Sequence, residues 1–333
     1  MFFVRPIKKD DLSEVFELAK KTGPGMTSLP TDHKLLEAKI QDSMNSFQIK
    51  PTEPRNEAYR FVLVNSKNKK IYGISAIRAR IGGFEPFYSY QIKTATHESK
   101  ELKVKKEVEY LELKEEFDGP SIISSLFLDP DLRGQKLGGL ISAARFFYMA
   151  DNPDRFTGTV IAEMRGYINK DKKSPFWEGT VKHFFDMEFT EADNMSAKDK
   201  GFIADLMPKY PIYIPLLAKD VIEAIGKVHD ETKPALEYLK KQGFSFDGHV
   251  DIFDAGPRIS SKLQDIKIIK ESKLLEIKSS TDLDDNIRPR IIGNPVNSFY
   301  TQTKAKLDGN CVYIDKEVLE VLKLKEGEQV RVY

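Results

Sequence analysis

A mostly apolar run that leads through a short polar loop into a helix constrains this chain more than any other segment. Residues 122–128 predict a strand, which Asp129-Pro130-Asp131 ends as a turn. A helix is expected from about Gly138 to Met149, and the loop before it carries arginine and glycine. The first N–H groups of a helix are unpaired and its dipole is positive there, so this loop is suited to bind phosphate groups of a ligand.

The segments around this loop predict a mixed order of strands and helices. A strand at 2–5 is followed by two amphipathic helices, at about 11–18 and 35–44. The charged run 100–116 fits either a solvated helix or a hairpin. Further strands are expected at 61–64, 71–77, 160–164, 244–246 and 249–253, and a further helix at 232–242.

The last part of the chain changes character after Gly256, where short β-rich runs alternate with turns. We expect two parts: an α/β part of residues 1–256, with a long insertion at about 166–230, and a small, mostly β C-terminal subdomain of residues 257–333. The β-rich runs of that subdomain are 266–269, 274–277, 290–292, 311–314 and 329–332.

This order of elements resembles that of the GNAT-type N-acyltransferases, whose strand leads into a loop of the form Arg/Gln-x-x-Gly-x-Gly/Ala. Arg133 and Gly138 fit the form, whereas Lys136 stands where the first glycine belongs. A helix that ends in Gly243-Phe244 before a strand matches the closing half of that fold. The resemblance implies an α/β (α+β) fold, with a mixed, largely antiparallel sheet flanked by helices. It also implies that an acyl-CoA donor is bound by Leu126, Phe127, Leu128, Arg133, Gly134, Gln135, Lys136, Gly138 and Gly139.

Composition narrows the class of partner. Lys and Arg number 52 against 51 Asp and Glu, so the whole-chain charge does not call for nucleic acid or an anionic membrane. No apolar run is long enough to cross a bilayer, and the single cysteine, Cys311, suits a reducing compartment. We therefore expect a cytoplasmic protein that acts on small molecules. The five histidines show no metal-ligand spacing, so no metal is expected.

The group that moves protons is less evident. The closing helix of GNAT-type enzymes often carries a tyrosine four residues before the glycine, but Leu239 occupies that position here. Tyr238 is one residue away, about 100° around the helix, so we expect it to point elsewhere. His229 is the leading replacement, because an imidazole exchanges protons near neutral pH. A surface or capping histidine remains an equal alternative on position alone.

The chain also resembles one family in particular, the arginine N-succinyltransferases. The resemblance implies transfer of a succinyl group from succinyl-CoA to the α-amino group of L-arginine. It also implies that His229 is the proton donor and that Leu126 contacts succinyl-CoA. A dimer or an assembly with a related subunit is expected on the same ground. The blocks that carry the resemblance are 21–30, 97–102, 126–133, 162–166, 174–177, 202–209, 211–213, 228–229, 250–254 and 256–257.

An arginine substrate needs a carboxylate for its guanidinium and donors for its own carboxylate. Glu163, Arg165, Thr27 and Ser28 are candidates, with a structural ion pair and a helix-end turn as the alternatives. Trp177 could wall the pocket or pack in the core. Two other functions stay open: a GNAT-type acyltransferase with another donor or amine, such as acetyl-CoA or ornithine, and a non-catalytic sensor of CoA or arginine.

Overall fold

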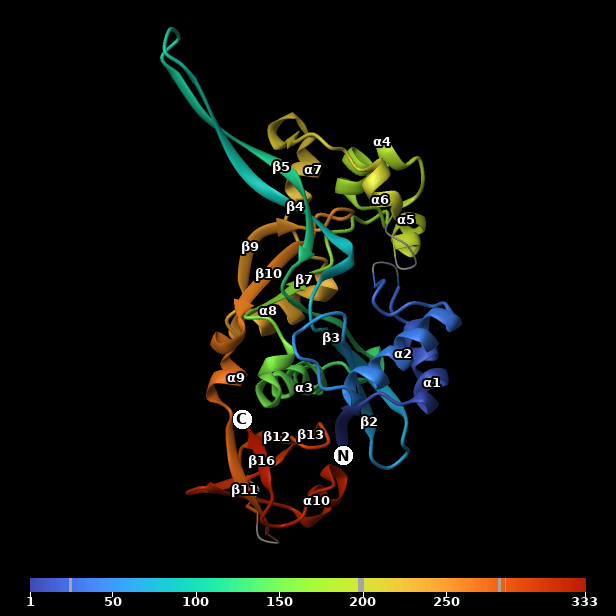
Figure 1. Cartoon of the computed structure of the whole chain (residues 1–333), viewed down its shortest axis with the longest axis vertical. Coiled ribbons are helices and arrows are strands. Elements are labelled where there is room, and N and C mark those ends of the chain that lie inside the picture. Colours follow the sequence, from blue (N-terminus) through green and yellow to red (C-terminus); the bar gives the residue numbers. More distant parts are fainter. Residues whose placement is uncertain (24–25, 197–200, 281–282, 285) are drawn as a thin grey trace.

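The computed structural model describes residues 1–23, 26–196, 201–280, 283–284 and 286–333, so block 21–30 and the insertion 166–230 include positions outside it. The described strands form one sheet (Figure 1). In sheet order they are β14 (Lys306–Asp308), β15 (Cys311–Ile314), β11 (Lys273–Ser279), β16 (Gln329–Val332), β12 (Pro289–Asn294), β13 (Phe299–Lys304), β1 (Phe2–Pro6), β2 (Ala58–Asn65), β3 (Ile71–Arg78), β6 (Ser121–Leu128), β7 (Thr159–Glu163), β10 (Pro257–Lys262), β9 (Ser245–Val250), β4 (Gly82–Ser99), β5 (Val104–Asp118) and β8 (Ile212–Tyr213).

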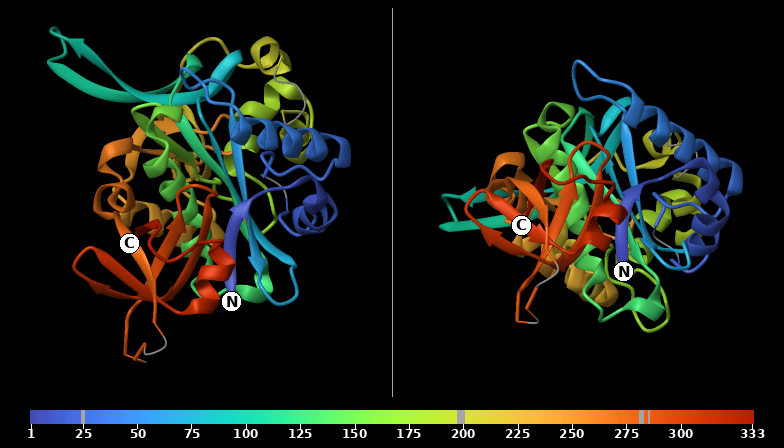
Figure 2. Two further views of the ribbon diagram at one scale, coloured as in Figure 1. Left: turned by 60° about the horizontal axis from the view of Figure 1, so that its bottom comes forward. Right: turned by 90° about the horizontal axis from the view of Figure 1, so that it is seen from below.

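Helices cover both faces of the central strands (Figures 1 and 2). Helices α1 (Leu12–Ala19) and α2 (His33–Gln48) lie on one face, and α3 (Leu137–Asp151), α8 (Lys233–Lys241) and α9 (Lys267–Glu271) lie on the other. The pairs β6–β7 and β11–β15 are parallel, and the other described pairs are antiparallel. The predicted mixed, largely antiparallel sheet flanked by helices, of GNAT type, is therefore confirmed.

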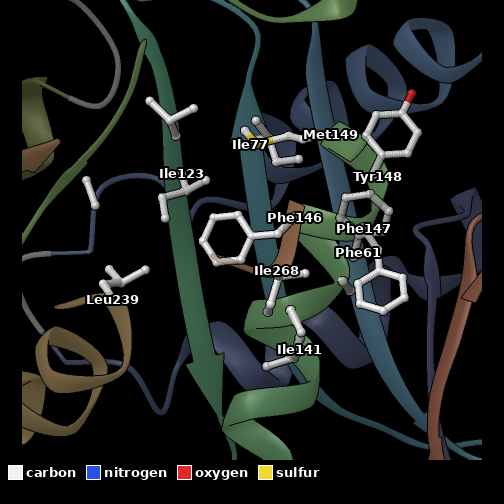
Figure 3. Packing of buried hydrophobic residues seen from close by; sticks show 14 of the residues in the cluster. Phe61, Ile77, Ile123, Ile141, Phe146, Phe147, Tyr148, Met149, Leu239 and Ile268 are labelled. Atoms are coloured by element: carbon white, nitrogen blue, oxygen red, sulfur yellow. The ribbon is translucent and has the colours of Figure 1, made fainter. Parts of the chain in front are cut away.

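The two-residue period of a strand explains how β2 serves both layers. Phe61 and Leu63 are buried in the cluster that contains α3, while Val62 and Val64 belong to the cluster on the α1 and α2 side. Figure 3 shows Phe61 and other strand residues beside the apolar side chains of α3. Burial on both faces fixes the register of β2, because a slip of one residue would exchange the two sets.

The insertion folds into short helices with a core of their own, and Trp177 is completely buried there. Its ring contacts the rings of Phe185, Phe189 and Phe253. Trp177 therefore packs the core of the insertion. The helices are α4 (Lys182–Phe185), α5 (Phe189–Ser196), α6 (Gly201–Leu206) and α7 (Lys219–Ala224), and a π-helical turn spans Trp177–Val181.

The charged run 100–116 is part of a hairpin and not a helix, since β4 and β5 pair along their length. Their outer ends project from the body as a long arm (Figures 1 and 2), while their middle parts pair with β9 and β8. The arm carries alternating charged side chains, and Leu102 at its tip is 73% exposed. None of the described helices is both long and apolar enough to cross a membrane.

The last part of the chain is largely β, with helix α10 (Lys316–Leu322) packed among its strands. The prediction of a strand at 266–269 is wrong. Ile266 is the N-cap of helix α9 and Ile268 lies in that helix, and both are buried in the cluster that contains α3. Strand β10 lies between β7 and β9 in the central sheet. The boundary between residues 256 and 257 stays a prediction.

Candidate active site

A break in the sheet positions the candidate site. The parallel ladder between β6 and β7 ends after Ile122 and Ile161, although both strands continue. A cleft of about 1400 Å³ is lined there by residues of both strands. On one side it is lined by α3 and α8, and on the other by α2, β2 and β3. A molecule in the cleft can therefore contact both layers of the fold.

Strand β6 carries a β-bulge inside the cleft. The register with β3 shifts between Ile74 and Ala76, so that Ser125 and Leu126 together face Ser75. Ser125 has a φ of 53°, which is unusual for a residue other than glycine. A bulge leaves one residue outside the ladder, so backbone groups near Leu126 are directed away from normal strand pairing.

The loop between α1 and α2 is tied to β6 at two points. The Ser125 hydroxyl donates to the Ser28 carbonyl oxygen at 3.3 Å. The Lys21 ammonium donates to the Asp129 carboxylate at 2.6 Å. These contacts bring Thr27 and Ser28 to the cleft wall.

The predicted phosphate loop forms the start of α3. Gly134 and Lys136 both have positive φ angles, 85° and 60°, and the first turn of the helix contains no acidic residue. A side chain added at Gly138 would meet no atom within 4 Å. The backbone of the first turn is therefore open to a ligand. Of the predicted loop residues, Arg133, Gly134, Lys136, Gly138 and Gly139 line the cleft, as do Leu126, Phe127 and Leu128, whereas Gln135 is exposed and does not.

The left-handed backbone at Lys136 explains why glycine suits this position. Lys136→Gly should raise the free energy of unfolding by about 1 kcal/mol, because glycine adopts this conformation without strain. The same change removes a cation from the loop and should weaken CoA binding severalfold. Denaturant unfolding and calorimetric CoA titration of the variant check both effects. A loss of stability would show that the lysine side chain supports the loop by other contacts.

His229 lies at the rim of the cleft, half-buried, where the insertion returns to the sheet. Its backbone N–H donates to the Arg165 carbonyl at 2.9 Å, beside the bridge between Gly166 and Val228. The Glu231 N–H donates to His229 Nδ1 at 3.2 Å. With Nδ1 engaged as an acceptor, the neutral ring carries its proton on Nε2. His229 does not itself line the cleft, but Arg165 and Glu231 do.

The environment keeps His229 neutral. Burial lowers its pKa below the ordinary histidine value, and the positive charge of Arg165 lowers the pKa further. The carboxylates of Glu231 and Asp230 act in the opposite direction but do not cancel the shift. His229 therefore has the geometry of a capping histidine, and it is also a neutral ring that presents an N–H donor.

The carboxyl end of β7 carries the predicted Glu163 and Arg165, and both line the cleft. A buried carboxyl group fixes the backbone beside them, since Asp254 accepts from the N–H groups of Gly166 at 2.7 Å and Gly256 at 2.8 Å. A side chain on Gly256 would lie 2.0 Å from the Met164 carbonyl oxygen. This close approach requires glycine and holds the end of β7 in place.

The structure also adds residues that the sequence did not single out. Tyr238 was expected to point away, yet it lines the cleft, with its hydroxyl buried and its ring near Gly139. Arg145 is completely buried in α3, where its guanidinium donates to the Ser142 hydroxyl at 2.6 Å. Arg60 and Arg78 line the opposite wall. Trp177 does not line the cleft.

In the described part of the chain, no three side chains of histidine, cysteine, aspartate or glutamate gather as a metal site. The cleft is lined by arginines and carboxylates, with His229 at its rim.

Comparison with known proteins agrees with this geometry. The profile of a family described as arginine N-succinyltransferase beta subunit matches residues 2–268. The chain is 38% identical to an arginine N-succinyltransferase of Yersinia pestis, covering 100% of this chain and 97% of the relative. The corresponding Escherichia coli protein is 36% identical over 99% of this chain and 97% of its own length.

A solved structure shares the whole fold. The arginine/ornithine succinyltransferase subunit AI of Pseudomonas aeruginosa superposes with a TM-score of 0.92 at 32% identity, covering 100% of this chain and 98% of that one. Agreement over the full length includes the last part of the chain, which the family profile leaves out. This chain belongs to the arginine N-succinyltransferase family and is an acyltransferase.

Proposed function

We propose that this chain transfers a succinyl group from succinyl-CoA to the α-amino group of L-arginine, as the first step in breaking arginine down. Family membership supports the reaction. The observation that carries it is the cleft through the divided sheet, because it joins a helix N-terminus suited to CoA phosphates with a wall of charged side chains suited to a charged acceptor.

The mechanism that fits this cleft is direct attack without a covalent enzyme intermediate. The uncharged α-amine attacks the thioester carbonyl carbon, the C–N bond forms, and the C–S bond breaks as the tetrahedral intermediate collapses. A backbone N–H at the bulge near Leu126 stabilises the oxyanion. As the Nε2–H proton of His229 passes to the sulfur, its Nδ1 takes up, by way of solvent, the proton that the nitrogen loses, so the ring is neutral before and after the step.

The acceptor meets groups of both signs. Glu163 supplies a carboxylate for the guanidinium, while Arg165 and the loop residues Thr27 and Ser28 supply donors for the α-carboxylate. These residues come from the carboxyl end of β7 and from the loop before α2. An acceptor held between them presents its amine to the carbonyl carbon.

Release of free thiol tests the function directly. Succinyl-CoA, acetyl-CoA and butyryl-CoA would each be combined with arginine, ornithine and lysine, and the thiol measured over time. We expect the highest kcat/KM for succinyl-CoA with arginine. Turnover with a different pair would assign another acyltransferase activity, and binding of CoA and arginine without thiol release from any pair would indicate a sensor.

The pKa of His229 sets a pH dependence. Because burial and Arg165 lower that pKa, the neutral ring should persist below pH 6.5, and activity should be lost only as the pH falls through the lowered value. Arg165→Met removes the neighbouring positive charge, so the acidic limb of the kcat/KM profile should move to higher pH. A limb that stayed in place would show that His229 is not the group being titrated.

We also propose that the chain acts in the cytoplasm, the reducing compartment that its single cysteine suits, and that it works as a dimer or with a related subunit. The Pseudomonas aeruginosa relative is itself described as a subunit. The β4–β5 arm supports assembly, because it projects from the body and exposes Leu102 and Val104 near its tip. Light scattering after gel filtration would give the number of chains.

A further inference from the structure

Two arginines share one face of the sheet at the far end of the cleft. In the β2–β3 ladder Arg60 pairs with Ala76 and Ala58 pairs with Arg78. Side chains of paired residues, and of residues two apart, lie on the same face, so Arg60 and Arg78 are diagonal neighbours. The other two corners of this square are alanines, which leaves space between the guanidinium groups. All four residues line the cleft.

This pair of cations lacks an anion. In the described residues neither arginine forms an ion pair with a carboxylate, and the buried guanidinium of Arg60 donates to the Lys39 carbonyl at 3.0 Å. Burial and the charge of Arg78 together lower the pKa of Arg60 to about 10, against an opposing effect of Asp42. Asp42 and Glu85 favour the charged form of Arg78 without pairing with it. Arg60 is buried and Arg78 is exposed on the cleft wall, and their like charges repel unless an anion lies between them, so the site is complementary to an anion.

The position of the pair relative to the bulge indicates which anion fits. Ala76 pairs with Ser124 of β6, and Arg78 pairs with Ile122. Ser124 lies two residues before Leu126, but the bulge places Ser125 and Leu126 together opposite Ser75, so the two positions are only about 3.3 Å apart along the strand. The free carboxylate of a succinyl group lies about 5 Å from its thioester carbon, by standard bond lengths. With the thioester carbonyl at Leu126, that carboxylate reaches the level of Ser124 and Ala76, between the two arginines.

We propose that Arg78, with Arg60 beside it, binds the free carboxylate of the succinyl group and thereby selects a dicarboxylic acyl donor over a neutral one. This specificity site rests on the proposed function for its donor. The carboxylate of the amino acid is the competing anion, but Arg165 follows the end of β7, where the acceptor is expected.

Binding without acceptor tests the site independently of turnover. Succinyl-CoA and butyryl-CoA have acyl chains of equal length and differ in the carboxylate. Calorimetry should show that the wild-type chain binds succinyl-CoA more tightly. Arg78→Met should weaken succinyl-CoA binding about 30-fold and leave butyryl-CoA binding unchanged. Arg78→Lys should restore part of the preference, because it restores the charge without the two-pronged geometry.

Arg80→Met is the matched control, because Arg80 follows on the same chain segment but pairs with Asp118 outside the cleft. It should leave the ratio of the two affinities unchanged. An unchanged ratio in Arg78→Met would overturn the site, even if arginine is succinylated.

A comparison of arginine with argininamide as acceptors completes the test. If Arg78→Met abolished the preference for arginine over argininamide, the two arginines would bind the acceptor's carboxylate and the proposal would be wrong. Absence of thiol release with succinyl-CoA and arginine would overturn only the proposed function.

Discussion

Replacing His229 with alanine should lower kcat by about 1,000-fold, within the range that positioned acid–base groups contribute. The reason is local: the Glu231 N–H donates to Nδ1, so the ring presents Nε2–H beside the end of β7. CoA affinity should stay within twofold of the wild type, because His229 does not line the cleft. The rate of thiol release at saturating substrate measures kcat, and calorimetric CoA titration measures the affinity.

His183→Ala is the matched control for this variant, since His183 is an exposed residue of α4 in the insertion. Its kcat should equal that of the wild type. Tyr238→Phe tests whether Tyr238 is the proton donor in place of His229, because Tyr238 also lines the cleft. Burial raises the pKa of its hydroxyl. If Tyr238→Phe lost turnover while His229→Ala kept it, the tyrosine would be the proton donor and the role of His229 would be wrong.

Gly138→Asp should reduce CoA affinity about 100-fold and stabilise the fold at the same time. A carboxylate in the first turn of α3 would face the negative phosphates, and like charges brought together cost several kcal/mol. The same carboxylate suits the positive end of the helix dipole, and replacing glycine within a helix adds to this gain. The free energy of unfolding should therefore rise by about 1 kcal/mol.

Opposite signs for binding and stability make this test specific. Gly158→Asp is the control, because Gly158 is exposed, has no atom within 4 Å of an added Cβ, and does not line the cleft. Its CoA affinity should not change. If Gly138→Asp unfolded the protein, the lost binding would carry no information on phosphates, so thermal melts must accompany the titration. Full CoA affinity in a stable Gly138→Asp variant would move the phosphate site elsewhere.

The elements around the phosphate loop could be predicted because each carries local signals. The strand at 122–128 ends at Asp129-Pro130, and the helix after it starts at a glycine-containing loop, so pattern and turn chemistry agree. Strand β2 was predicted from its apolar run alone, although it begins at Ala58 rather than Phe61. Its first three residues include Arg60, which the apolar run does not contain.

What could not be predicted depends on contacts between distant segments. The run at 266–269 is β-prone, yet packing against α3 makes part of it a helix, since tertiary contacts override weak propensity. The diagonal position of Arg60 beside Arg78 follows from the β2–β3 register, which no single segment reveals. An arginine inside the buried strand Ala58–Asn65 was the one local hint, because an isolated charge in such a strand needs a partner or a role.

The place of β1 between β2 and β13 has a consequence for how the chain folds. The Thr301 hydroxyl donates to the Phe2 carbonyl at 2.7 Å across 299 positions of sequence. At 5 to 20 residues per second, synthesis takes roughly 15 to 60 s to span that separation. Throughout this time one edge of β1 is unpaired and open to other strands. Such long-range pairing also slows folding. This chain should therefore depend on chaperones during its synthesis more than proteins whose first strand pairs with near neighbours.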